Sequence, residues 1–277
     1  MDLNSGFTHA CSFIFGQEIG DMKDYENYLK EAMVGKLARS SLSGDRLFLL
    51  SDQYCGKARF FDYAKEHEKV SDILSKPLDI NKIKDTDSLF SAVKEKYLYA
   101  GGKVLGQSEE IVASDDITNS QHISYSSMIV NSKYLAYCYQ MRNTEYAFAS
   151  TSSGDSSWIL RCFYNNSLQR CFECSASIKL RDCYFCYNLR NCNDCMFTFN
   201  TQAKSYMIGN IQLEKQKYLG LKKKLLGEIV SQLKQNKRLN FSIINIPQLG
   251  EVGNQNPALG VRQPISAESS KVDSVIK

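Results

Sequence analysis

The chain lacks both a positively charged N-terminal start and any long hydrophobic run. Its first twenty residues, MDLNSGFTHACSFIFGQEIG, contain only a short and interrupted apolar stretch, so neither a secretory signal nor a membrane-spanning helix is predicted. We therefore expect a cytoplasmic protein with no membrane partner. In that compartment the ten cysteines are expected to be thiols or metal ligands rather than disulfides.

The sequence also has little that resembles a catalytic site. The segment SSGDSS at 152–157 has no nucleophile-elbow context, and three carboxylate groupings lack aligned partners: Asp85 with Asp87, Asp115 with Asp116, and Asp182 with Asp194. Each is better interpreted as loop or corner chemistry. We expect neither catalysis nor a cofactor.

What the sequence does contain is an internal repeat of twelve residues over 107–214, which begins QSEEIVASDDIT, NSQHISYSSMIV, NSKYLAYCYQMR. The second, fifth, eighth and eleventh positions of the nine segments are small or aliphatic, and of these 36 positions only Lys204 is charged. All eight cysteines of the segment lie at these positions, and none of its sixteen aromatic residues does. These positions are therefore predicted to point inward.

A twelve-residue coil encloses too little space for an aromatic ring, which explains the small inward residues. The predicted fold is mainly β: a narrow right-handed parallel β-helix of about nine coils, about 40 Å long. The first position of the repeat is often a residue that tolerates positive φ and suits a corner: Asn119, Asn131, Asn143, Asp155 and Asn191.

Two resemblances follow from these residues. The spacing is similar to the small β-helix of insect antifreeze proteins, with repeat T-C-T-x-S-x-x-C-x-x-A-x. Ice binding in that family needs threonines flanking the second position, whereas here the flanking residues are Asn and Gln, Asn and Lys, or Asp and Ser, so that activity is not implied. The stretch CYFCYNLRNCNDCMFTFN followed by SYMIGNIQLEKQKYLGLKKKLL resembles the end of uncharacterised cysteine-rich repeat proteins of archaea and candidate-phylum bacteria, which implies a fold and no activity.

The flanks of the repeat divide the chain into an N-terminal capping region (1–106), the β-helix (107–214), a basic amphipathic C-terminal capping helix (215–238) and an extended tail (239–277). Helices are predicted over 21–40, 56–77 and 86–98, and a strand at RLFLLSD (46–52). We expect the N-terminal elements to cap the open edge of the solenoid. A short extended element is predicted over 242–252, and from 253 onward the tail is expected to be disordered or ordered by a partner.

Three pairs with C-x-x-C spacing raise the question of metal binding, and the candidate ligands are Cys171, Cys174, Cys183 and Cys186. The same spacing is the inward period of the repeat, so these cysteines are equally explained as a ladder of buried thiols. A structural zinc site and disulfides are the alternatives. No histidine lies near them in sequence.

Aromatic residues that cannot fit inside must stand on the outer walls, and those proposed for interaction are Tyr137, Phe163, Phe172, Tyr184, Tyr187, Phe197 and Phe199. Either the flanking helices cover them or they form a homo-oligomeric or partner interface. Residues 215–238 carry eight basic residues against one acid, with Lys222, Lys223 and Lys224 at the centre. These lysines are either the solvated face of a helix or, with arginines at positions 142, 161, 170, 181 and 190 beside the aromatics, a nucleic-acid surface.

The predicted function is therefore a non-catalytic scaffold or interaction protein within a homo-oligomer or larger assembly. The alternatives are an RNA- or DNA-binding accessory protein and a structural zinc-binding protein.

Overall fold

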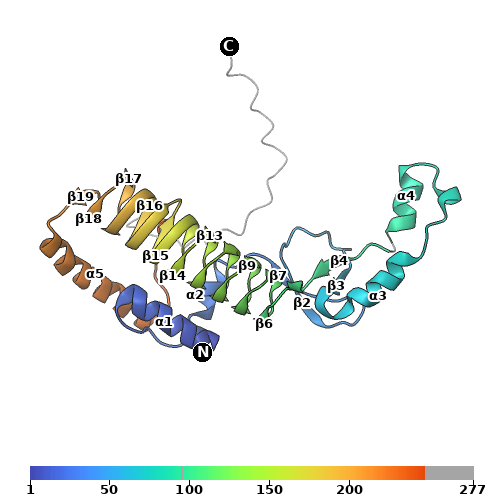
Figure 1. The fold of residues 1–277 in the computed structure, drawn as a ribbon, viewed down its shortest axis with the longest axis horizontal. Coiled ribbons are helices and arrows are strands. Elements are labelled where there is room, and N and C mark those ends of the chain that lie inside the picture. Colours follow the sequence, from blue (N-terminus) through green and yellow to red (C-terminus); the bar gives the residue numbers. More distant parts are fainter. Residues whose placement is uncertain (95, 247–277) are drawn as a thin grey trace, which may run out of the picture.

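The structure is a computed structural model that describes residues 1–94 and 96–246. It contains a parallel β-solenoid of about nine turns, with helices packed along one side and a helical arm beyond its N-terminal end (Figure 1). The predicted mainly β architecture and the spacing of twelve residues are confirmed. Lys133, for example, pairs with Gln121 in one neighbouring coil and with Glu145 in the other.

The strands form two walls joined at corners. The first wall holds β6 (Glu109–Val112), β8 (Gln121–Ser124), β10 (Lys133–Ala136), β12 (Glu145–Phe148) and β14 (Ser157–Leu160). The second holds β5 (Val104–Leu105), β7 (Asp115–Thr118), β9 (Ser127–Val130), β11 (Tyr139–Arg142) and β13 (Thr151–Gly154). The longer β15 (Phe163–Ser175) and β16 (Ile178–Met196) continue through the corners, and β17 (Phe199–Gln202), β18 (Ser205–Ile208) and β19 (Ile211–Gln212) complete the solenoid.

The solenoid repeats a unit of three residues within each coil. Every third residue from Ser114 to Thr198 is buried. The residue just before each inward one adopts a left-handed backbone, with φ between 44° and 61° at every third position from Glu110 to Tyr206. This backbone costs non-glycine residues about 1–2 kcal/mol each, so contacts between coils must offset it. The predicted Asn and Asp corners are confirmed, but Tyr, Phe, Trp and Arg also occupy such positions, which composition did not indicate.

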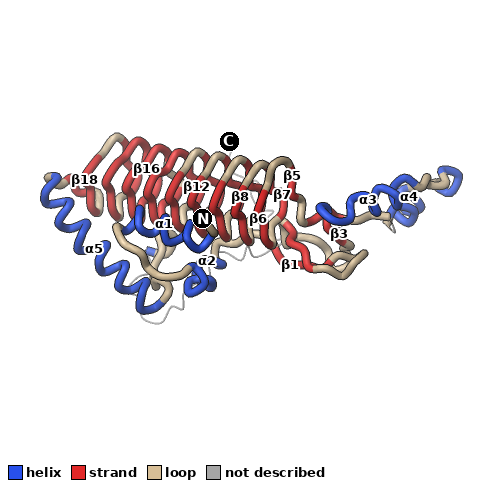
Figure 2. Tube along the Cα trace, turned by 60° about the horizontal axis from the view of Figure 1, so that its bottom comes forward, coloured by secondary structure: helices blue, strands red, loops and turns tan. Residues whose placement is uncertain are grey.

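Helices cover one side of this rod. They are α1 (Leu3–Phe15), the 3-10 helix η1 (Met22–Tyr25), α2 (Glu26–Lys30) and α5 (Lys215–Asn236). The long helix predicted over 21–40 is wrong, because η1 and α2 end by Lys30 and a strand begins at Lys36. The helix α1 was not predicted from the sequence, and it lies along β10, β12, β14 and β15 (Figure 2). These helices lie against a lateral wall rather than over the open edge.

A separate group of elements precedes the first coil. The hairpin of β1 (Lys36–Arg39) and β2 (Arg46–Leu49) confirms the predicted strand, and β3 (Phe60–Asp62) pairs in parallel with β4 (Tyr99–Gly101). Between β3 and β4 the chain forms α3 (Tyr63–Ser75), the 3-10 helix η2 (Ile80–Lys82) and α4 (Thr86–Val93). Together α3, η2 and α4 form an arm that projects away from the rod (Figure 2). The helices predicted over 56–77 and 86–98 are present here but shorter. The helix α3 begins only at Tyr63, because 60–62 is a strand, and α4 ends at Val93.

The C-terminal helix α5 agrees with the predicted helix after the repeat. Within 242–246 the chain turns rather than extends, since the backbone N–H of Asn245 donates to the carbonyl of Ser242 (3.0 Å). The remainder of the element predicted over 242–252 and the tail from 253 lie outside the described residues. Among the described helices, none combines the length and apolarity needed to cross a membrane.

Candidate functional site

Inward serines connect successive coils through their hydroxyl groups. The Ser120 hydroxyl donates to the carbonyl of Thr118 (2.8 Å) and accepts from the backbone N–H of Ser132 in the next coil (3.0 Å). The same two bonds recur at Ser126 and at Ser132. Because a buried hydroxyl must be hydrogen-bonded to be tolerated, the inward serines act as bridges and not only as small fillers.

The inward cysteines occupy equivalent places. The Cys138 thiol lies 3.3 Å from the carbonyl oxygen of Ala136 in its own coil and 3.3 Å from that of Ala147 in the next. All eight inward thiols donate in this way to at least one backbone carbonyl, and all ten cysteines of the chain are free. Burial raises the pKa of Cys138 to about 12, so its thiol stays protonated at neutral pH.

The four candidate metal ligands, Cys171, Cys174, Cys183 and Cys186, are fully buried in two adjacent inward columns. Burial raises the pKa of Cys174 and of Cys183 above the ordinary range. At Cys171 and Cys186, hydrogen bonds from neighbouring thiols and backbone groups outweigh burial and lower the pKa, to about 5 for Cys171. In the part of the chain that the structure describes, no group of three or more His, Cys, Asp or Glu side chains is arranged to hold a metal ion. The arrangement fits a ladder of buried thiols.

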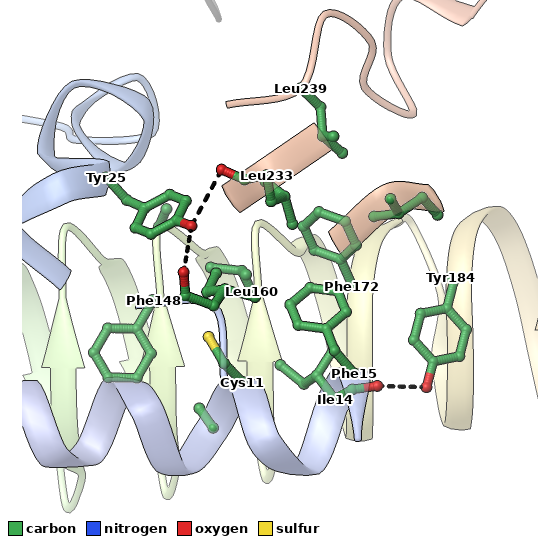
Figure 3. Packing of buried hydrophobic residues seen from close by; sticks show 14 of the residues in the cluster. Cys11, Ile14, Phe15, Tyr25, Phe148, Leu160, Phe172, Tyr184, Leu233 and Leu239 are labelled. Carbon is green, nitrogen blue, oxygen red and sulfur yellow. Dashed lines mark hydrogen bonds between the residues drawn. The ribbon is translucent and has the colours of Figure 1, made fainter. Parts of the chain in front are cut away.

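Most of the aromatic residues proposed for interaction are buried by the protein's own helices. Tyr137, Phe163, Phe172 and Tyr184 belong to one apolar cluster with α1, α2 and α5 (Figure 3). Phe15 of α1 packs edge-on against Phe172 with ring centroids 5.1 Å apart. Of the two explanations from the sequence, coverage by the flanking helices therefore applies to these four residues.

The remaining three aromatic residues differ in exposure. Phe197 and Phe199 are half-buried and pack against the same cluster, whereas Tyr187 is 44% exposed. Tyr187 pairs in register with Phe199 of the next coil, as the twelve-residue spacing predicts. Only Tyr187 of the seven proposed aromatic residues is thus largely open to solvent.

The three candidate lysines of α5 do not act together. Lys222 forms an ion pair with Asp194 (3.0 Å) and lies over the rings of Tyr184 and Tyr218, at 5.1 and 5.8 Å from their centroids. It therefore anchors α5 to the solenoid. Lys223 and Lys224, the next two residues of the helix, are exposed.

The arginines beside the aromatic positions also differ in exposure and in ion pairing. Arg170 forms a two-bonded pair with Asp182, both at 2.7 Å, and Arg161 is almost fully buried at 1% exposure. Arg142, Arg181 and Arg190 are exposed. The continuous basic surface expected on the nucleic-acid interpretation is therefore interrupted by internal ion pairs.

A buried ion pair beneath α2 was not apparent from the sequence. Arg161 donates from Nε to Glu173 (2.5 Å) and from its terminal nitrogen to the backbone carbonyl of Tyr28 (2.9 Å). Glu173, which is 0% exposed, also accepts from the hydroxyl of Ser242 (2.5 Å) and the backbone N–H of Ile243 (3.1 Å). Both residues occupy the same repeat position one coil apart. The sequence did carry a signal for this ion pair, because Arg161 and Glu173 are charged residues at a repeat position that apolar residues otherwise occupy.

Four of the six carboxylates considered as catalytic candidates have structural partners: Asp85, Asp115, Asp182 and Asp194. Asp115 is buried and accepts from the backbone N–H groups of Leu50 and Lys103 (3.0 and 2.9 Å), which attaches the β1–β2 hairpin to the first coil. Burial raises the pKa of Asp115. Asp85 caps the N-terminus of α4 by accepting from the backbone N–H of Ser88 (2.8 Å). Asp182 and Asp194 form the ion pairs described above.

The arm is the part of the described chain with the least internal packing. No residue of α4 is buried, and in α3 only Glu66 and Val70 are. Large apolar side chains stand open to solvent along it, at 58% for Leu74, 77% for Ile80 and 60% for Phe90. Isolated helices of this length are unstable in water, and the described residues of the chain bury little of α3 and nothing of α4.

No protein-family model matches the chain, and no curated protein matches its sequence.

Proposed function

We propose that the protein is a non-catalytic interaction protein of the cytoplasm, in which the solenoid is a rigid spacer and the arm binds a second copy of the chain. The observation that carries this proposal is the exposed apolar surface of the arm, around Ile80 and Phe90, on helices that bury almost nothing. Exposed apolar patches of this kind mark interaction sites in soluble proteins.

Charge favours a second copy as the occupant. Residues 63–94 contain six Lys and six Asp or Glu, so the arm has no net formal charge from these residues. Two arms brought together therefore do not repel each other electrostatically, and the arm has no net charge that would attract a strongly charged partner. A twofold arrangement would place the same patch on both sides of the interface and bury Ile80 and Phe90 of each copy. Tyr137, Phe163, Phe172 and Tyr184 of the solenoid cannot serve this role, because α1, α2 and α5 cover them.

The test is the mass of the full-length protein in solution by light scattering on a sizing column. The double substitution Ile80→Ser and Phe90→Ser is expected to convert a dimer to a monomer, with no loss of β signal in circular dichroism. The matched control is Tyr187→Ser with Phe199→Ser, on the outer wall of the solenoid, which should leave the mass unchanged. A parent protein that is monomeric, or a control that dissociates while the arm variant does not, would overturn the proposal.

Nucleic-acid binding receives less support, since Lys222, Arg161 and Arg170 are engaged within the chain. Retention of the same preparation on nucleic acid that weakens steeply with salt would favour it over self-association. The resemblance to uncharacterised cysteine-rich repeat proteins adds no activity to either proposal.

A further inference from the structure

The N-terminal end of the solenoid is covered on one wall and open on the other. On the second wall, Val104 of β5 pairs with Ile117 of the first coil (107–118), and Ile117 is 0% exposed. On the first wall, β6 is the last of the described strands and pairs only with β8 (Figure 2). Its inward residue Ile111 is half-buried, whereas Ile123 in the next coil is 0% exposed. The interior of the rod is therefore open to solvent at β6.

The backbone of β6 also has no described strand on its outer side. In the next coil, the N–H of Tyr125 donates to the carbonyl of Val112 one coil earlier (3.1 Å). By this pattern the N–H of Ala113 points toward a coil that would precede the first. The described residues 96–101 do not form that coil, because Tyr99–Gly101 pairs with β3 instead. Unpaired strand edges of this kind accept a further extended strand.

A strand that binds this edge must match the residues of the first coil. Ser108, Ile111 and Ser114 occupy its inward positions, so the strand needs small or aliphatic residues at every third position over seven residues. Glu109 and Glu110 stand exposed on the outside. A basic residue next to these two acids would therefore favour binding.

We propose that residues 269–275 of the same chain, which read SSKVDSV, bind the open edge at β6 as an additional rung of the solenoid. Aligned with residues 108–114, they have small or aliphatic residues at all three inward positions: Ser269, Val272 and Val275. Ser108 bridges to the N–H of Ser120 in the following coil through its hydroxyl (3.1 Å). Ser269 is placed to form the same bridge to the N–H of Ser108.

Charge selects this register over its neighbour. Aligned in this way, Lys271 lies beside Glu110, at the same repeat position one coil earlier. A shift of three residues keeps small or aliphatic residues inward but places Glu268 beside Glu110, where the two carboxylates repel. In the favoured register the carbonyl of Asp273 accepts from the N–H of Ala113, as Val112 accepts from Tyr125.

The intervening chain is long enough to reach the edge within one molecule. Ser242 and Ile243 are held at Glu173, six coils of twelve residues from the edge or about 29 Å along the rod. Residues 247–268 can span about 70 Å when extended. A segment tethered in this way binds at a higher effective concentration than a separate molecule does. The contact is made on the rod and does not depend on association through the arm.

The test is disulfide trapping in the full-length protein carrying Cys55→Ser, which removes the one exposed native thiol. Glu110→Cys with Lys271→Cys places two thiols on stacked coils, where the Cα atoms are about 4.8 Å apart and a disulfide can form. Mild oxidation should link these residues within one chain, as measured by mass spectrometry of the digested protein. In the control, Glu145→Cys with Lys271→Cys, the two positions lie about 19 Å apart along the rod and should not link.

Hydrogen exchange gives a second readout that needs no added cysteine. Val272→Asp places a charge at an inward position and should speed exchange of the Ala113 amide by about tenfold, as expected for the loss of one hydrogen bond. The control Val261→Asp changes the same segment outside the proposed rung and should leave this amide unchanged.

Three results would overturn the proposal. They are equal linking in the two cysteine pairs, links that form only between two chains, and exchange of the Ala113 amide that Val272→Asp does not alter. Links between two chains would show that a second copy, and not the same chain, supplies the rung.

Discussion

The solenoid and the arm differ in how much of each is buried by neighbouring parts of the protein. In the solenoid every third residue from Ser114 to Thr198 is buried, and backbone and side-chain hydrogen bonds join each coil to the next. In the arm, α4 buries no residue and Ile80 is 77% exposed. Both are formed by short elements that could not be stable alone. The difference is that each coil has neighbours of the same kind, whereas the arm has none among residues 1–94 and 96–246.

The comparison shows why repetition stabilises a narrow fold. A coil of twelve residues has a thin core, but stacking supplies both partners for its backbone groups and a continuous interior. On the proposed function, the arm gains the same benefit from the arm of a second copy. The following substitutions test the contrast, starting with the largest expected effect.

Cys174→Phe should abolish the folded solenoid, since the fully buried thiol has no space around it for a ring. Cys174→Ala and Cys174→Ser should fold, and the serine variant keeps a donor for the carbonyl of Phe172. The matched change in the arm, Ser91→Phe at an exposed position of α4, should have little effect. Circular dichroism with thermal unfolding measures all four variants. A Cys174→Phe protein as stable as the parent would contradict the narrow inward register.

Arg161→Met should lower the free energy of unfolding by about 3–5 kcal/mol, because it leaves the buried carboxylate of Glu173 without its cation. Adding Glu173→Leu should recover most of the loss. The partly exposed pair provides the control, and Arg170→Met should cost about 1 kcal/mol or less. Urea unfolding measures each value. If Arg161→Met and Arg170→Met cost the same, the buried pair does not hold α2 and Ser242 on the rod.

Alkaline pH should weaken the rod gradually. The folded pKa of Cys138 is about 12, above its ordinary value of 9.0, so folding favours the protonated thiol. Its contribution to stability is fully present below pH 9.0 and is lost as the pH rises toward about 12. Thermal unfolding over this range measures the effect, which Cys138→Ser should reduce.

The thiols also distinguish the rod from the segment before it. Under native, mildly alkaline conditions iodoacetamide should label Cys55, the one exposed cysteine, while the inward thiols remain unmodified. Rapid labelling of several inward thiols in the folded protein would show that the coils open more readily than their packing indicates.

Sequence reasoning was most accurate where the physical constraint is local and repeated. The exclusion of aromatic residues from one position in three identified both the inward face and the pairing of Tyr187 with Phe199. It was least accurate for α1. The apolar residues Phe7, Ile14 and Phe15 of this helix pack against the wall of the solenoid, and that packing cannot be read from the local sequence. The predicted helix over 21–40 failed for a related reason, because its apolar residues are divided among η1, α2, the segment after α2 and β1.

The sequence by itself determined the coil length and the inward residues, among them eight cysteines, since these follow from the cross-section of a twelve-residue turn. Only the tertiary structure decided which outer residues are available to a partner. That outcome depends on where α1, α2 and α5 lie, and a periodic pattern carries no information about which of its faces a distant helix will bury. The same packing engaged Lys222 with Asp194 and Arg161 with Glu173, and left Ile80, Phe90, Lys179 and Arg181 open to solvent.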